Sequence, residues 1–252
     1  MYLYFEATTV LYTLTVITVL FLVAGVLACA VLVKKGKAKS LHHNVHPGAI
    51  IKAFIFDVVL QLQILKISFV RWFMHFCIFI GFMGLLAQTT VMAFMSHFLP
   101  LDSPIAKTFF DVQGGTGARV LDVWGDVFGV MLVVGLAIAI IRRYIVKTKQ
   151  LDTIMKDTMS ICFLTAIAVT GFLCEAFRLM DPQYASIAAY SFAGNALSNV
   201  LQAIGIGVMN YKGWVWIHAI ISMIFLGYIP FSKAWHIFVS PIEIVLDASE
   251  RA

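Results

Sequence analysis

The sequence predicts an all-α, polytopic membrane protein with five transmembrane helices. Of its 252 residues, 61% are hydrophobic and only 12% are charged, and the mean hydropathy is +0.93. A soluble domain needs more charge than this to keep its surface hydrated. Several uncharged runs also reach about 20 residues, the length that crosses the apolar core of a lipid bilayer. Residues 1–252 are therefore expected to form a single membrane domain.

Charged residues or prolines mark the ends of most of the expected spans. The first apolar run ends at Lys34, and the second lies between Arg71 and Pro100. The third run stops at Arg142, and the fifth stops before Pro241. These limits place the five spans at about 8–33, 71–97, 120–141, 154–177 and 214–239.

Basic residues are distributed unevenly among the loops. Most of the 18 Lys and Arg residues lie between the first two spans, between the third and fourth spans, or near the C-terminus. Because basic loops stay in the cytoplasm, the N-terminus is expected outside and the C-terminus inside the cell. The net charge of +5 therefore indicates topology and not a nucleic-acid partner.

Two further segments are partly apolar. Residues 185–209 carry no charge and are long enough for a sixth span, but they contain several Ser, Asn and Gly residues. We expect a non-spanning hairpin or helix on the outer face there, with a sixth span as the alternative. Residues 47–66 mix Lys52, Asp57 and Lys66 with apolar residues, as in an amphipathic helix on the cytoplasmic surface.

Two histidines lie in the expected fifth span. Ionisable residues inside a bilayer are costly and usually face a site. His218 and His236 are 18 residues apart, which is five turns of a continuous helix, so both rings would leave one face about 27 Å apart. They cannot share a metal, and each needs a partner from another helix.

The expected second span offers those partners. His75 lies near its cytoplasmic end, at the depth of His236, and His97 lies near the depth of His218. Two such histidine pairs stacked across the membrane would hold two haems. Three nearby glycines would leave room for flat macrocycles: Gly81, Gly84 and Gly227.

Other roles for these residues remain open. An intramembrane histidine can bind a neighbouring backbone group or belong to a proton relay. His97 also lies at the end of a span, where burying a histidine in the bilayer costs little free energy. The histidines of the basic loop are expected to be solvated or to lie at a subunit interface: His42, His43 and His46. The four cysteines stand singly in apolar runs, which favours packing over a metal site: Cys29, Cys77, Cys162 and Cys174.

Several motifs resemble a known family. The last helix and the start of the second span are similar to the gamma-subunit family of respiratory nitrate reductases, which are b-type cytochromes. The matching stretches are Trp214–His218, Tyr228–Lys233, His236, Pro241, Arg71–His75 and Gly81–Gly84. Thr170–Arg178 and Asp122–Asp126 are more similar to the membrane cytochromes of the Dsr, Tmc and Hmc complexes of sulfate-reducing bacteria. The resemblance covers nearly the whole chain and is most specific in the fifth span.

This resemblance implies haem b between the second and fifth helices in a bacterial cytoplasmic (inner) membrane. The family's ligands match His75, His218 and His236. The gamma subunit has another histidine ten residues after the first, and here that position is Leu85. Either His97 substitutes, or the outer haem has a different ligand, or it is missing. One or two haems are expected, with two favoured.

The expected function is electron transfer between menaquinone and partner subunits. The chain has no motif for an iron–sulfur cluster or a c-type haem, so it needs such partners. The resemblance implies an iron–sulfur protein on the cytoplasmic side and a multihaem cytochrome c or other redox subunit outside. Two alternatives remain, a proton- or ion-conducting transporter that uses the histidines and a bare membrane anchor for redox subunits.

Polar residues at the outer span ends are candidates for a quinone site. Glu175 and Arg178 share a helix face at the end of the fourth span. Glu175 could move protons for a quinone, although the pair could also be an ion pair that anchors the helix end. Asp122 and Asp126, together with Arg119, are expected mainly to anchor the third span.

Overall fold

The computed structural model of the chain describes residues 8–36, 47–100, 103–110, 115–147, 155–207 and 211–250. Within these ranges the protein is all-α, as the sequence predicts. The elements are α1 (Thr8–Gly36), α2 (Pro47–Ala53), η1 (Phe54–Val59), α3 (Leu62–Ile67), α4 (Phe69–Phe98), α5 (Pro104–Phe110), α6 (Thr116–Ile140), η2 (Ile141–Ile145), α7 (Met155–Leu179), η3 (Pro182–Tyr184), α8 (Phe192–Ala203), α9 (Tyr211–Tyr228), η4 (Ile229–Phe231), η5 (Lys233–Trp235) and α10 (His236–Glu250). Elements η1 and η2 are π-helical turns, and the other η elements are 3₁₀ turns.

Four helices of the described part are long and apolar enough to cross a membrane. They correspond to α4, α6, α7 and α9, with apolar stretches at Phe69–Met95, Thr116–Ile145, Asp157–Leu179 and Tyr211–Phe231. Helix α1 contributes a shorter apolar stretch, Thr15–Ala28. The protein is therefore a multi-pass membrane protein. A first span in α1 and the orientation of the termini stay predictions.

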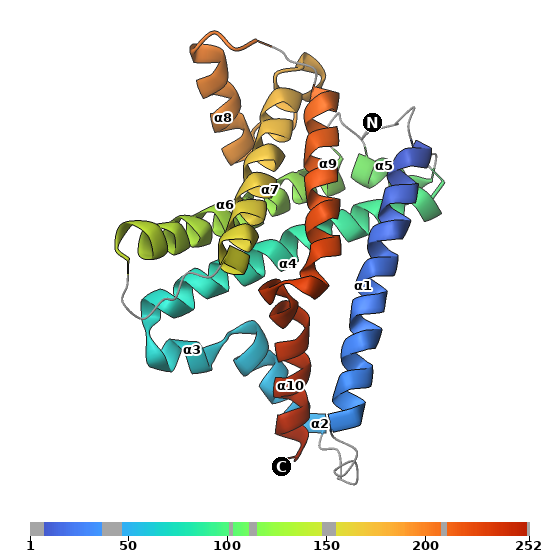
Figure 1. Cartoon of the computed structure of the whole chain (residues 1–252). Helices are drawn as coiled ribbons and strands as arrows, with labels where there is room; N and C mark the ends of the chain where they lie inside the picture. Colours follow the sequence, from blue (N-terminus) through green and yellow to red (C-terminus); the bar gives the residue numbers. More distant parts are fainter. Residues whose placement is uncertain are drawn as a thin grey trace.

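The long helices form two packed groups (Figure 1). Helix α4 packs along α6, and α7 packs along α9 and α8, with α1 beside α9. In Figure 1 the α4–α6 pair crosses the α7–α9 pair, and α10 continues below α9 to pack against α2 and η1. The two groups share one apolar core.

Aromatic and aliphatic side chains of four helices build that core. Phe225 of α9 is fully buried, and its ring centroid lies 5.9 Å from that of Phe82 on α4 and 5.7 Å from that of Phe163 on α7. Leu132 of α6 is equally buried in the same cluster. Leu85 packs against it, so the position where the gamma subunits carry a histidine is here part of the packing.

Backbone-to-backbone contact holds α4 against α6. A Cβ atom on Gly81 would lie 2.7 Å from the backbone nitrogen of Leu132, and a Cβ atom on Gly135 would lie 2.8 Å from that of Ile78. Small residues permit such close approach between membrane helices, where dispersion contacts replace the hydrophobic effect. These two glycines are therefore interface positions.

Two of the three glycines assigned to macrocycle space have a different role. Gly81 faces α6, and so does Gly84, whose missing side chain makes room for the ring of Phe128. The expectation that these two leave space for a haem was wrong. Gly227 has no atom within 4 Å of an added Cβ atom, so open space is present at that position.

The last expected span is not one helix. Helix α9 ends at Tyr228, and η4 and η5 follow before α10 begins at His236. Pro230 explains the interruption, because it lacks an N–H group and its ring clashes with the preceding turn. Ser232 is extended, and its hydroxyl oxygen accepts a hydrogen bond from the backbone N–H of Ala234 at 3.1 Å, which starts the new turn. The prediction of one helix over 214–239 was wrong, and with it the shared face of His218 and His236.

The segment 47–66 is also broken. A π-helical turn follows α2, and Gln61 then adopts a left-handed backbone (φ 53°, ψ 39°) before α3. A single amphipathic helix over this segment was therefore incorrect. Sequence periodicity does not reveal a left-handed residue that is not glycine, because few such residues occupy this region.

The apolar segment 185–209 contains only the 12-residue helix α8, preceded by turns. A helix that spans a bilayer needs about 17 residues or more. Helix α8 instead packs beside α7 and α6. The described part of this segment thus has no spanning helix, and its location on the outer face stays a prediction.

Candidate functional site: a histidine pair with its supporting hydrogen bonds

Two histidines from distant parts of the chain face each other. His75 lies in the second turn of α4, and His236 is the first residue of α10. Their ring centroids are 5.9 Å apart, with an angle of 48° between the ring planes. The two rings lie close together, as their expected depth predicts, although the turn at Pro230 separates α9 from α10, and their role as ligands stays a prediction.

The spacing of the pair suits an iron atom between the rings. A metal held by two imidazole nitrogens places the ring centres about 6 Å apart, because each metal–nitrogen bond is about 2 Å long and each nitrogen lies about 1 Å from its ring centre. The observed 5.9 Å agrees with this value. The His75 and His236 rings are therefore spaced as they would be to hold one iron between them.

The His75 ring is held on its Nδ1 side. This nitrogen lies 2.9 Å from Oε1 of Gln61, so Nδ1–H donates and the amide oxygen accepts. The carbonyl oxygen of Leu60 accepts a 2.7 Å hydrogen bond from the indole N–H of Trp72, one turn before His75. The turn at residues 60–61 is thereby fastened to α4 at two points.

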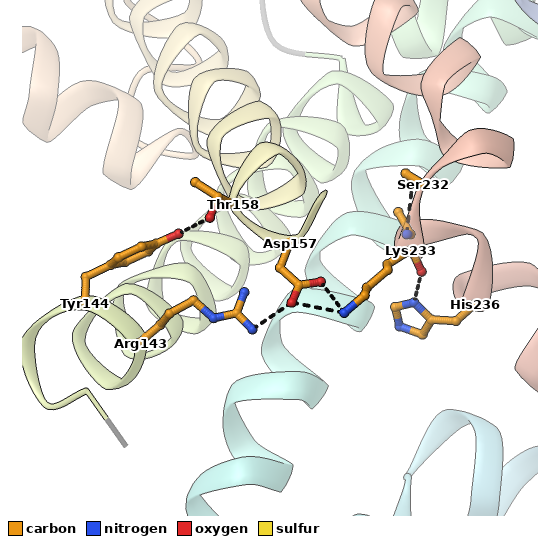
Figure 2. Close-up of polar contacts among 8 residues, drawn as sticks. Arg143, Tyr144, Asp157, Thr158, Ser232, Lys233 and His236 are labelled. Atoms are coloured by element: carbon orange, nitrogen blue, oxygen red, sulfur yellow. Dashed lines mark hydrogen bonds and ion pairs between the residues drawn. The ribbon is translucent and has the colours of Figure 1, made fainter. Parts of the chain in front are cut away.

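The His236 ring is held in the same way by a backbone group. Its Nδ1–H donates to the carbonyl oxygen of Lys233 at 2.6 Å (Figure 2). The Lys233 ammonium forms an ion pair with Asp157 of α7 at 3.0 Å. Arg143 of η2 binds the same carboxylate at 3.2 Å, as Figure 2 shows. The turn that carries His236 is thus tied to α7 and, through Arg143, to the end of α6.

His218 is anchored to α7. Its Nδ1 lies 3.0 Å from the hydroxyl oxygen of Thr170. That hydroxyl donates its single proton to the carbonyl oxygen of Ala166 at 2.7 Å, so Nδ1 of His218 must be the donor. Gly171 is adjacent, and a Cβ atom there would lie 3.3 Å from Cε1 of the ring. This glycine leaves room for the imidazole.

All three histidines therefore present the same nitrogen to a ligand. Each engages Nδ1–H with an acceptor, which leaves the lone pair of Nε2 available. Metal-binding histidines nearly always show this arrangement, because the second hydrogen bond fixes the ring and the tautomer. The described side chains contain no cluster of three or more His, Cys, Asp or Glu that could hold a metal ion.

Some of the predicted site residues lie outside the described part of the structure. His97 lies within α4, but its side chain falls outside the described residues. Its pairing with His218 therefore stays a prediction. The loop histidines His42, His43 and His46 also lie outside the described residues. Among the described cysteine side chains, Cys77, Cys162 and Cys174 form no disulfide.

The predicted quinone-site residues belong to a buried charge cluster beneath α8. Arg178 binds Asp122 of α6 at 3.0 Å and Glu175 at 3.8 Å. Glu175 in turn forms a side-chain hydrogen bond with Asp126. The two acids therefore lie close together next to Arg178. Arg178 thus has a structural role, because its ion pair with Asp122 joins α7 to α6.

Asp126 also caps helix α8 from outside. It is fully buried and accepts hydrogen bonds from the backbone N–H groups of Ala193 at 2.6 Å and Gly194 at 3.4 Å. These groups lie in the first turn of α8, where an anion satisfies unpaired donors and the helix dipole. The prediction that Asp126 anchors its own helix is therefore too narrow, because it also positions α8.

Changing Asp126 to alanine is expected to lower the free energy of unfolding by about 2–3 kcal/mol, because two buried N–H groups lose a charged acceptor. Asp126→Asn keeps an acceptor oxygen and should recover most of that loss. Thermal unfolding in detergent measures both variants, and Glu243→Ala, on exposed α10, is the control. Equal melting temperatures for Asp126→Ala and Glu243→Ala would show that the cap contributes nothing.

The residues that hold the histidine rings were not found from the sequence. Gln61 belongs to no motif and acts from a left-handed turn. Lys233 lies in a stretch noted for its family resemblance, but it acts through its backbone carbonyl. Thr170 belongs to a stretch noted only for its family resemblance. The position of Thr170, a polar residue inside an apolar span, was the one sequence feature that could have indicated its role.

Comparison with known protein families gives one match that covers most of the chain. The model of the HdrE family, the E-subunits of dihydromethanophenazine:CoB--CoM heterodisulfide reductase, matches residues 51–244. This range contains the four histidines of the expected spans and leaves out the three of the loop. No solved structure gives a significant match.

Several similar proteins are E-subunits of heterodisulfide reductase, and one is a quinone oxidoreductase. The heterodisulfide reductase E-subunit of Methanosarcina mazei is 27% identical over 212 residues, which is 83% of this chain and 71% of the relative. Its counterpart in Methanosarcina thermophila is 28% identical over 222 residues, 84% of this chain and 71% of the relative. An EtfAB:quinone oxidoreductase of Syntrophomonas wolfei is 29% identical over 129 residues, 47% of this chain and 18% of that protein. A membrane subunit of a redox complex is thereby supported, whereas the closer likeness to nitrate reductase gamma subunits is not confirmed.

Proposed function

Since this chain belongs to the HdrE family of heterodisulfide reductase subunits, we propose that it binds haem b and transfers electrons between a membrane-dissolved carrier and partner subunits. The family consists of membrane subunits of an electron-transfer complex. The observation that carries the proposal is the His75–His236 pair, with 5.9 Å between ring centroids and both Nδ1 atoms already engaged.

In this proposal Nε2 of His75 and Nε2 of His236 would hold the iron of one haem. The bound haem supplies the one-electron iron couple, and the protein supplies position, ligand basicity and a dry environment. Gln61 and the Lys233 carbonyl keep both rings in the ligating tautomer. The buried aromatic core around Phe82 limits water on the side towards the middle of the bundle.

A second haem is proposed at His218. Its ring has the same tautomer, with Thr170 as the acceptor. We propose His97 as the second ligand, because its position in the sequence places it near the same membrane depth as His218. Leu85 is excluded as a ligand by its chemistry and by its packing against the core.

The proposed electron carrier is a lipid-soluble molecule of the quinone type. Such molecules carry two electrons and two protons, so their site needs a proton acceptor as well as a route to the haem. The relatives are named for dihydromethanophenazine and for quinone, and menaquinone has the same chemistry. We propose Glu175 as the residue that exchanges protons with the carrier and Arg178 as its neighbour, since the two side chains lie 3.8 Å apart in the cluster beneath α8.

Partner subunits complete the proposed electron path. The basic loops predicted on the cytoplasmic side suit a soluble iron–sulfur protein with an acidic face. On the outer side a multihaem cytochrome c or another redox subunit is proposed. The bacterial cytoplasmic membrane is the proposed location.

The test starts with the visible spectrum and pyridine haemochrome of purified protein. Absence of a b-type α-band would refute haem binding. With haem present, Glu175→Gln should slow reduction by a menaquinol or dihydrophenazine analogue by about 100-fold, the contribution typical of a general base, while reduction by dithionite stays unchanged. Glu243→Gln is the matched control on exposed α10. Equal rates in both variants would remove Glu175 from the carrier site, and the faster analogue identifies the carrier class.

A further inference from the structure

Gln61 is a buried polar residue in an uncommon backbone conformation. Its relative exposure is 5%, and its φ of 53° lies in the left-handed region. Only a few per cent of non-glycine residues adopt that region, because Cβ crowds the backbone there. Such a residue persists only where its surroundings determine the conformation, and these positions cluster at functional sites.

The surroundings of Gln61 determine it from both sides. The π-helical turn η1 ends at Val59, and the carbonyl oxygen of Gln61 accepts the backbone N–H of Ile64 at 3.0 Å, which begins α3. Trp72 binds the preceding carbonyl oxygen, that of Leu60, at 2.7 Å. The left-handed residue therefore interrupts the chain between two helical segments, and its side chain contacts His75.

We propose that Gln61 is a positioning residue that sets the basicity of His75 and thereby the reduction potential of the group that His75 holds. This inference rests on the proposed haem function. The Gln61 amide oxygen is a neutral acceptor for His75 Nδ1–H at 2.9 Å. A stronger acceptor makes the opposite nitrogen a better donor to the metal, and hydrogen bonding of this kind to a ligand tunes haem potentials.

The two ligands of the pair differ in how they can be tuned. The acceptor for His236 is the backbone carbonyl of Lys233, which no side-chain substitution removes. The acceptor for His75 is a side chain, so substitution at Gln61 changes its strength directly. Because Gln61 is buried, a charge introduced there is weakly screened and acts strongly on the neighbouring imidazole.

Two substitutions test the proposal in opposite directions. Gln61→Glu supplies an anionic acceptor and should favour the oxidised state about tenfold, a shift of about 59 mV to lower potential for one electron. Gln61→Gly removes the acceptor but adopts a positive φ without strain, so it folds. It should raise the potential and weaken haem retention by about 10- to 100-fold, as loss of a hydrogen-bond partner of a metal ligand does.

The measurement is spectroelectrochemical titration of the whole membrane protein, together with haem loss to an acceptor protein over time. Gln63→Glu is the control, because Gln63 is exposed on α3 two residues away and its charge is the same. If Gln61→Glu and Gln61→Gly titrate like Gln63→Glu and retain haem like the unchanged protein, the role of Gln61 is refuted. A parent protein without any b-type spectrum would instead refute the haem proposal itself, so the two failures are distinguishable.

Discussion

Replacing His75 with alanine is expected to remove one full equivalent of haem from each polypeptide. The ring is half of a pair whose centroids are 5.9 Å apart, and a single remaining imidazole cannot hold both axial positions. Loss of a ligand should exceed the 10- to 100-fold loss of affinity that follows removal of a ligand's hydrogen-bond partner. Pyridine haemochrome analysis per mole of protein measures the result.

Matched histidine variants sharpen this experiment. His236→Ala should cause the same loss, and the double variant should lose no more than either single one, because both act on one site. His218→Ala should spare this haem, and His43→Ala, in the predicted loop, should spare all haem. Retention of full haem content by His75→Ala would contradict the assignment of the pair.

Substituting Gly81 with leucine is expected to separate α4 from α6 and to destabilise the protein by about 3 kcal/mol or more. The nearest atoms to an added Cβ atom are the backbone nitrogen of Leu132 at 2.7 Å and the carbonyl oxygen of Phe128 at 2.8 Å. Backbone atoms cannot move aside as a flexible side chain can, so the helices must shift. Thermal unfolding in detergent and the yield of folded protein measure the effect.

Gly213→Leu is the control for that substitution. Gly213 lies in the first turn of α9, and an added Cβ atom meets nothing within 4 Å. Gly81→Ala should give an intermediate result, because it adds the clashing Cβ atom without a longer side chain. If all three variants melt together, the close contact between α4 and α6 does not limit stability.

Hydropathy and loop charge were sufficient to predict the α-helical class and most long helices. Helices α4, α6 and α7 begin and end within a few residues of the expected limits, since long uncharged runs leave few alternatives in a bilayer. The pair of His75 and His236 was also predicted, because both lie near the same expected membrane surface. The depth of a residue in the membrane can be predicted from its distance in sequence to the ends of its span.

Local backbone breaks were not predicted. The expected fifth helix includes Pro230, although proline removes a backbone hydrogen bond and an unpaired backbone group is costly inside a bilayer. In the structure, 3₁₀ turns and the Ser232 cap satisfy the freed groups. The direction of Gly81 was likewise misjudged, because composition shows that small residues allow close approach but not which neighbour approaches. Contacts between α6 and α4 decide that.

The turn at Pro230 makes the position of the His218 ring geometrically independent of that of the His236 ring. In an uninterrupted helix, insertion of one residue between His218 and His236 would rotate one ring by about 100° relative to the other. Here 3₁₀ turns separate them, and Lys233 fixes the second position to Asp157 on a different helix. A residue inserted in the 3₁₀ turns is therefore expected to leave both rings in place, because each is held by its own hydrogen bonds.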